Sequence, residues 1–125
     1  MIGCRFHDAF DVCVCQIAWI LGSHFRAGEW GMHPRCGSVI TCVIGGRSLY
    51  ARVVKFLRVE GDTHPGYASV RWFSEPTYVN RLTPKVTLDG SLIEEELGSN
   101  MIRITQIDPS QVLVLNRNLD IMNTL

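Results

Sequence analysis

Apolar and polar residues alternate through the middle of the chain, and this alternation predicts β-strands. Gly45-Gly46 separates the first two runs, because paired glycines accept the positive φ angles of a tight hairpin turn. Turn-forming residues fill positions 61–66, and Pro76 ends the next run because proline has no N–H to donate to a ladder. The strands expected in this central region are Val39–Ile44, Ser48–Val59 and Tyr67–Phe73.

The N-terminal segment Phe10–Leu21 fits two patterns. Its apolar residues recur at helical spacing behind Asp8, a residue type that caps helices, yet Val12–Cys15 is also typical of a strand. The high content of β-branched and aromatic residues favours the strand. A loop marked by Gly28, Gly31, Pro34 and Gly37 is expected to follow.

Short apolar runs continue to the end of the chain, with turns at Asp89-Gly90 and Asp108-Pro109-Ser110. Leu92–Leu97 fits either a strand or a single helical turn. Further strands are expected at Lys85–Leu88, Met101–Ile107 and Gln111–Asn116. Closely spaced short strands are typical of a barrel or a compact sandwich. We therefore expect a mostly β fold, a small partly open barrel with an additional N-terminal strand or helix.

Length and composition indicate a single globular domain over residues 1–125, since 46% of residues are hydrophobic and 19% charged. The formal net charge is zero, which argues against a purely electrostatic nucleic-acid binder. The charge is unevenly distributed, with seven basic and three acidic residues in 47–85 but two basic and six acidic residues in 86–125. Either the two regions attract and pack together, or the basic region forms a binding surface.

Strand alternation divides the central hairpin into two faces. One face is apolar, interrupted by Lys55 alone, and predicts a core: Leu49, Ala51, Val53, Leu57 and Val59, with Ala68, Val70 and Trp72. The other face mixes aromatic rings with guanidinium groups. It is either packed against the N-terminal segment or a recognition surface, where rings stack and arginines pair with anions. The candidate binding residues on it are Tyr50, Arg52, Phe56, Arg58, Tyr67, Arg71 and Phe73.

The strand beginning Ala51-Arg52-Val53, a loop, and then Val70-Arg71-Trp72-Phe73 with Pro76 resemble the core hairpin of bromo-adjacent homology (BAH) domains. The resemblance covers residues 51–76. It implies a distorted, SH3-like barrel that recognises proteins, often chromatin components. Of the family's residues only Trp72, Phe73 and Pro76 carry over, in a structural role. The segments that usually follow the proline in the family, and its aromatic cage for methylated lysine, cannot be identified in this chain.

A second resemblance extends to the segment Ile104–Val114, which is similar to a β-rich module of proteins derived from eukaryotic DNA transposons. The expected function is therefore a non-enzymatic module that binds another protein, in a chromatin setting. One alternative is a nucleic-acid-binding module of a mobile-element-derived protein, using Arg52, Arg58 and Arg71. Another is a structural or oligomerisation subunit whose apolar N-terminal strand adds to a partner sheet.

The five cysteines lack the spacing of a secreted disulfide scaffold, and no Asn-X-Ser/Thr acceptor is present. These features predict reduced thiols and a nuclear or cytoplasmic location. The apolar run Val12–Gly22 is too short to span a bilayer and has no cleavage site after it.

One constellation has metal-ligand chemistry. The pairs Cys4/His7 and His33/Cys36 have the spacing of a zinc knuckle, with Cys13, Cys15 and Cys42 as further thiols. Buried free cysteines are common as small hydrophobic residues, so we expect no metal or other cofactor. The sequence has no nucleophile elbow or phosphate-binding loop, and Glu94-Glu95-Glu96 is typical of a solvated edge. We expect no enzyme activity.

Overall fold

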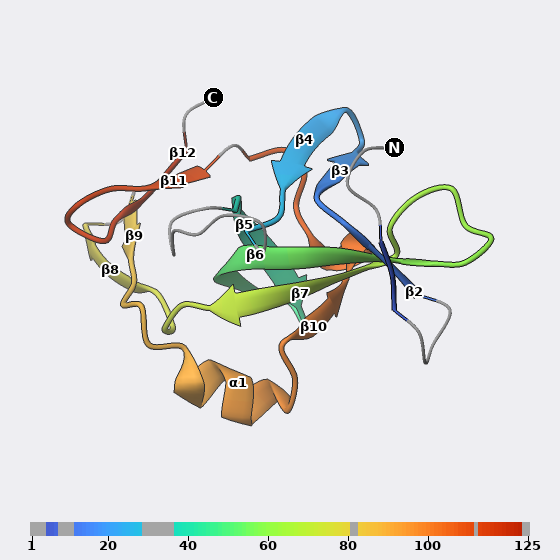
Figure 1. The fold of residues 1–125 in the computed structure, drawn as a ribbon. Coiled ribbons are helices and arrows are strands. Elements are labelled where there is room, and N and C mark those ends of the chain that lie inside the picture. The colour runs from blue at the N-terminus through green and yellow to red at the C-terminus, as the bar shows by residue number, and fades with distance from the viewer. Residues whose placement is uncertain (1–4, 8–11, 29–36, 81–82, 112, 124–125) are drawn as a thin grey trace.

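The computed structural model describes residues 5–7, 12–28, 37–80, 83–111 and 113–123 (Figure 1). These residues form a mostly β structure with one short α-helix, which confirms the predicted class. Within the described residues the sheets remain open and do not close into a barrel. The elements are β1 (Arg5–His7), β2 (Val12–Cys15), β3 (Ile17–Ile20), β4 (Ser23–Arg26), β5 (Val39–Ile44), β6 (Arg47–Val59), β7 (Tyr67–Trp72), β8 (Thr77–Asn80), β9 (Thr83–Lys85), α1 (Ser91–Leu97), β10 (Met101–Arg103), a 3-10 turn (Ile104–Gln106), β11 (Leu113–Leu115) and β12 (Ile121–Asn123).

The long strand β6 organises the eight-stranded sheet. On one edge it pairs with β7, which in turn pairs with β10. The opposite edge is shared by β5, which pairs with the first half of β6, and β2, which pairs with the second half. Between these two strands, Gly28 N donates to Val53 O and Val53 N donates to Ser38 O. The edge of β6 is thus occupied along most of its length.

The pairing of β6 with β7 slips at Val54. The residues on either side of it, Val53 and Lys55, lie opposite the consecutive residues Val70 and Ser69, so Val54 has no partner in the ladder. A β-bulge of this kind moves every later side chain of the strand to the opposite face. The residues that share the core face of β6 are therefore Leu49, Ala51, Val53 and Phe56.

Two apolar clusters cover the two faces of this sheet. The larger cluster buries the core face of β6, and the β3–β4 hairpin contributes Ala18, Ile20 and Phe25 to it. Ile93 of α1 joins the same cluster. The smaller cluster covers only one end of the other face, and its buried members are Val39, Tyr50, Phe73, Val86 and Ile121. One half of that second face is thus packed, and the remainder is open.

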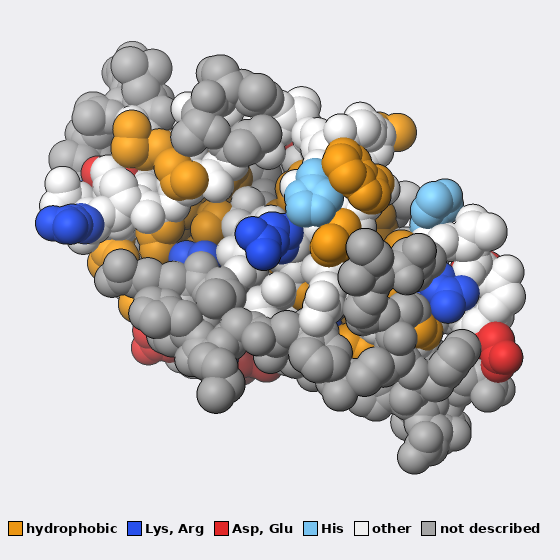
Figure 2. Space-filling model, turned by 45° about the horizontal axis from the view of Figure 1, so that its top comes forward, with side chains coloured by type: hydrophobic (Ala, Val, Ile, Leu, Met, Phe, Trp, Pro, Cys, Tyr) orange, Lys and Arg blue, Asp and Glu red, His pale blue; other side chains and the backbone are white. Residues whose placement is uncertain are grey.

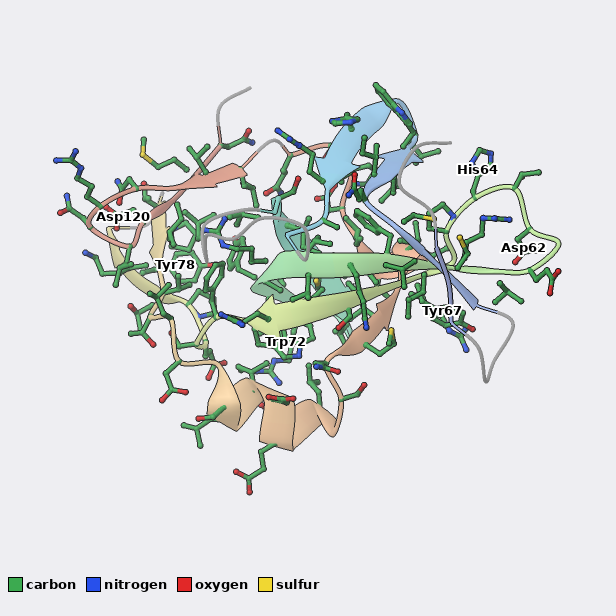
Figure 3. All side chains as sticks on the ribbon, viewed as in Figure 1. Asp62, His64, Tyr67, Trp72, Tyr78 and Asp120 are labelled. Carbon is green, nitrogen blue, oxygen red and sulfur yellow. The ribbon has the colours of Figure 1, made fainter. Side chains whose placement is uncertain are left out.

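Gly90 allows the segment before α1 to cross closely over the end of β7. A Cβ atom at this position would lie 2.0 Å from the main-chain oxygen of Trp72, so no other residue fits without movement of the backbone. The indole N–H of Trp72 donates to Ser99 O at 3.0 Å, just beyond the other end of the helix. Figure 3 shows Trp72 in the space between β7 and α1. This tryptophan therefore fixes both ends of the helix against the sheet.

Several elements differ from the expectation. The N-terminal segment is β, as favoured, but it breaks at Gln16 into β2 and β3. Leu92–Leu97 is helical, within α1. The strand expected to reach Ile107 ends at Arg103, where the 3-10 turn begins. The expected strand Lys85–Leu88 is replaced by β9, which ends at Lys85.

Four short strands, β1, β4, β8 and β12, were not predicted, and within the described part of Gln111–Asn116 the strand is β11. Both edges of β2 are paired within the chain, to β1 and β6. The other part of the predicted strand, β3, pairs with β4 alone among the described residues, so the oligomerisation alternative stays a prediction. No helix among the described residues is long and apolar enough to cross a membrane.

Candidate functional site

The predicted binding residues do not form one exposed face. Tyr50 and Phe73 belong to the smaller core cluster and Phe56 to the larger one, where it is fully buried. These three rings are core residues, as in the packed interpretation of the hairpin. Tyr50 and Phe73 pack in the cluster with Val39 of β5, Val86 and Ile121 of β12, and no residue of the N-terminal segment is a described member of it.

The bulge at Val54 explains why Phe56 and Arg58 leave the predicted face. After the bulge they project towards the same side as their cross-strand partners on β2, Cys15 and Cys13. The guanidinium of Arg58 donates to Asp62 O at 2.6 Å, and it also hydrogen-bonds the Cys15 thiol. Through these two bonds Arg58 links the β6–β7 loop to β2 on the core side of the sheet, and its guanidinium does not lie on the predicted binding face.

Arg52 stays on the predicted face but is occupied. Its guanidinium donates to Gly37 O at 2.9 Å and lies 5.9 Å from the centre of the Phe73 ring. That distance is within the range of a cation–π contact. Arg52 marks the border between the packed half of this face and its open half.

The open half brings together residues from three strands. Lys55, Ser69 and Met101 form one cross-strand row, and Leu57, Tyr67 and Arg103 form the next. Directly paired side chains project from the same face of a sheet. We call this surface the outer sheet face and define it as Lys55, Leu57, Tyr67, Arg71, Met101 and Arg103. Tyr67 is 40% exposed, and the loop bearing Asp62 and His64 projects beyond it (Figure 3).

Of these six residues, only Tyr67 and Arg71 were predicted. Lys55 had been assigned to the apolar face, because the bulge cannot be seen in the alternation. Met101 and Arg103 were missed because their place depends on the pairing of β10 with β7, two strands that are distant in the sequence. The position of Lys55, a cation in the middle of an otherwise apolar face, was the one indication in the sequence of a register shift in β6.

The outer sheet face is electropositive. In the part of the chain that the structure describes, Lys55, Arg71 and Arg103 form no ion pair. Strands β6, β7 and β10 contain no acidic residue. Arg71 also lies directly opposite Arg52, and adjacent like charges repel. An anionic group at this position would reduce the repulsion.

Acidic residues limit this surface on the side of α1. A pocket of about 430 Å³ lies there, with Ser69 and Arg71 on one wall and Asp89 and Glu94 on the other. Hydrogen bonds from the Ser91 hydroxyl and main-chain N–H lower the pKa of Asp89, so its carboxylate stays charged at neutral pH. The negative charges of this wall would repel an anion, whereas the surface at Tyr67 and Arg103 lies on strands without acidic residues.

The described cysteines offer little reactivity. Cys13 is disulfide-bonded, contrary to the expectation of reduced thiols, whereas Cys15 and Cys42 form no disulfide and are buried. Burial raises the pKa of Cys42 to about 12, and it also raises the pKa of Cys15. Cys4, His33, Cys36 and the side chain of His7 lie outside the described residues. Among the residues that are described, no group of three or more His, Cys, Asp or Glu side chains could hold a metal ion.

Comparison with protein-family models, curated proteins and solved structures finds no match to this chain. The geometry of the outer sheet face and the sequence resemblances are therefore the indications of function.

Proposed function

We propose that this protein is a non-enzymatic interaction module whose outer sheet face binds an acidic segment of a partner protein. The observation that carries the proposal is the set of three cations that form no ion pair with any described residue, Lys55, Arg71 and Arg103, beside the exposed Tyr67 and Met101. Charges at an interface attract a complementary partner and orient it, while aromatic and methionine side chains supply contact area. The face combines both in one place.

The BAH resemblance of residues 51–76 supports a protein partner, and the SH3-like architecture remains part of this proposal. The positive charge of the outer sheet face also restricts the kind of partner, because a lysine- or arginine-rich tail would be repelled by Lys55, Arg71 and Arg103. Within chromatin, we therefore propose an acidic protein segment as the ligand. A nuclear or cytoplasmic location remains our prediction.

A second candidate function is binding of single-stranded nucleic acid. It is favoured by the Tyr67 ring, which lies directly opposite Arg103 across the β7–β10 pair. An exposed ring beside cations can stack on a base while the cations contact phosphates. The small number of free cations makes this the weaker of the two candidates, since affinity for nucleic acid grows with the number of phosphates neutralised.

The two candidates can be separated with two fluorescent probes titrated against the intact chain. One is an acidic peptide of alternating glutamate and leucine, and the other is an oligothymidylate of equal charge. Arg71→Glu should weaken binding of the peptide by about tenfold or more, because it replaces attraction with repulsion. The matched control is Arg117→Glu, which reverses an exposed arginine in the β11–β12 turn, away from this face, and should change binding less than twofold.

Equal losses in Arg71→Glu and Arg117→Glu would show that net charge alone drives binding, and the proposal would fail. Binding of the oligothymidylate alone, with a steep decrease as salt rises, would establish the nucleic-acid candidate in its place.

A further inference from the structure

A second recess lies on another part of the molecule, between the β3–β4 hairpin and the β5–β11 region. It has a volume of about 380 Å³. Trp19 and His24 form one wall, with ring centres 4.7 Å apart, and Trp19 is 64% exposed. Figure 2 brings this side of the molecule forward and shows hydrophobic side chains gathered beside a histidine over the hairpin. We call this recess the hairpin pocket; its lining residues are Trp19, Gly22, Ser23, His24, Phe25, Ser38, Val39, Gln111 and Leu113.

Among the described residues, no strand pairs with β4 on the side that faces the hairpin pocket. Ala27 N donates to Gln16 O, so these two residues form a hydrogen-bonded pair. Hydrogen-bonded and non-hydrogen-bonded pairs alternate along an antiparallel hairpin. Counting from Gln16 and Ala27, Trp19 and His24 are a non-hydrogen-bonded pair. The N–H and C=O groups of His24 therefore point outwards, to the same side as those of Arg26. The Arg26 groups bond Ser38, through N–H to the hydroxyl and through C=O to the main-chain N–H.

No corresponding bond of His24 to another segment is found within the described residues. The segment that contains Ser38 hydrogen-bonds β4 at Arg26. The next residue of that segment, Val39, pairs with Leu113 and not with β4. The hairpin pocket thus opens where β4 loses its neighbour. An unpaired strand edge is a template for another strand.

Gln111 supplies a fixed polar group on the far wall. Its amide oxygen accepts from the Thr41 hydroxyl at 3.1 Å, and its amide nitrogen donates to Asp108 at 3.2 Å. Asp108 is itself held by the main-chain N–H and the hydroxyl of Ser110. The amide keeps one N–H and one lone pair in excess of these bonds. Its orientation is therefore set before any ligand arrives.

We propose that the hairpin pocket binds an extended, uncharged peptide segment of a partner protein, which pairs with the β4 edge at His24 and places an aliphatic side chain against Trp19. Main-chain pairing to a free edge supplies affinity, and the pocket for one side chain supplies selectivity. The fixed amide of Gln111 matches a peptide group, which offers one donor and one acceptor.

The charge of the lining supports an uncharged occupant. None of the nine lining residues is Asp, Glu, Lys or Arg. A charged side chain would lose its hydration there without gaining a partner, and this costs free energy. The hairpin pocket therefore differs in chemistry from the outer sheet face, and binding at either site does not depend on binding at the other.

The test uses the intact chain labelled with ¹⁵N and a capped pentapeptide, acetyl-Ser-Val-Leu-Thr-Ser-amide. Addition of the peptide should shift the His24 amide resonance and slow its hydrogen exchange, because the N–H acquires an acceptor. Binding should change less than twofold between 50 and 500 mM salt and in Arg71→Glu, which separates this site from the outer sheet face. An unchanged His24 amide at millimolar peptide would overturn the proposal.

Two peptides methylated at alternate main-chain nitrogens test the strand pairing directly. Only one edge of the peptide can face β4, so one methylated version should lose about tenfold or more in affinity while the other binds as before. Equal affinities of the two versions would exclude strand pairing and overturn the proposal. Binding of a peptide with Asp or Lys in place of Leu at equal affinity would do the same.

Trp19→Ala should weaken binding by about tenfold or more, because large aromatic residues supply much of the affinity at such sites. Leu21→Ala is the matched control: Leu21 lies at the tip of the same hairpin, is 90% exposed and does not line the pocket. Equal effects of the two substitutions would contradict the proposal. Light scattering completes the test, since a dimer that protects the His24 amide without peptide would make a second copy of this chain the occupant.

Discussion

A single unpaired residue determines how the aromatic rings of this protein are used. Tyr50 and Phe56 are six positions apart on β6, and simple alternation puts them on one face. Because Val54 forms a bulge, Phe56 enters the larger core cluster and Tyr50 the smaller one. Tyr67 lies on the same face as Tyr50 but beyond the smaller cluster, and it stays accessible. The role of each ring therefore depends on register and on what covers it.

Replacing Phe56 should affect stability far more than replacing Tyr67. Phe56→Ala removes a fully buried ring and leaves a cavity, which should lower the free energy of unfolding by about 3–5 kcal/mol. Tyr67→Ala removes a partly exposed ring and should cost less than about 1 kcal/mol. Urea unfolding followed by circular dichroism measures both values. Similar losses in the two variants would mean that Tyr67 is a core residue and not part of a binding surface.

Tyr50 should make stability decline at alkaline pH. Burial, together with the neighbouring Tyr78, raises the pKa of Tyr50 to about 12, above its value of about 10 in an unfolded chain. The neutral hydroxyl is therefore favoured by folding. Its contribution is complete below pH 10 and is lost as the pH rises towards 12. Tyr50→Phe should thus show a smaller decline in unfolding free energy over this interval.

Cys42 does not obscure the comparison, because its thiol is present in both proteins and contributes equally. Urea titrations at pH 9, 10 and 11 give the decline of the unfolding free energy with pH for the wild type and for Tyr50→Phe. Parallel declines in the wild type and Tyr50→Phe would show that the Tyr50 hydroxyl is accessible to solvent.

Alternation could predict much at the level of single residues, but not the bulge. The apolar positions Leu49, Ala51, Val53, Ala68, Val70 and Trp72 were all assigned to the core, where they lie. Assignments failed beyond Val54, because a bulge changes which residues face the core without changing the sequence pattern. The candidate site was found only in part for the same reason. Its two residues from β7, Tyr67 and Arg71, follow no bulge and were correctly placed.

At the scale of elements, the β3–β4 hairpin combines packing with local strain. Its inner side buries Ala18, Ile20 and Phe25, while Trp19 faces solvent. Its turn places Leu21 at φ 47°, a left-handed conformation in which a side chain with a Cβ atom is crowded. Glycine and asparagine are the usual residues at this position of a two-residue turn. A leucine there is unfavourable both for the backbone and for exposure.

Leu21→Asn should therefore stabilise the protein, by about 0.5–1 kcal/mol. The reverse change is Gly22→Ala in the same turn, where φ is 85° and no atom lies near the added Cβ. It should destabilise by about 1 kcal/mol through the backbone alone. Thermal unfolding of both variants tests the pair. A loss of stability in Leu21→Asn would mean that the leucine side chain contributes packing in the folded protein.

The length of an element decided whether the sequence revealed it. The strands β5, β6 and β7 have 6, 13 and 6 residues, enough for alternation to be recognised. Strands β1, β4, β8 and β12 have 3 or 4 residues and were missed, since so few positions cannot establish a period. Such short strands form because a neighbour is already in place. Their existence is a property of the tertiary structure.

At the scale of the whole molecule, one sheet face serves two purposes. The smaller cluster covers its first half and adds to stability, while the second half remains open with three cations and no acid on its strands. None of the six residues of the outer sheet face belongs to either apolar cluster. Binding and stability should consequently be separable by mutation.

The triple variant Lys55→Ala, Arg71→Ala and Arg103→Ala tests this separation. None of the three cations forms an ion pair within the described residues, so the free energy of unfolding should change by less than about 0.5 kcal/mol per site. Loss of Arg71 also removes a repulsion with Arg52. The formal net charge, +0 in the natural sequence, becomes negative by three, which should raise solubility near pH 7. Binding of the acidic probe should be lost in the same protein. Calorimetry measures the stability of the variant, and precipitation with ammonium sulfate measures its solubility. Unfolding of the variant at a markedly lower temperature than the wild type would mean that these side chains support the fold.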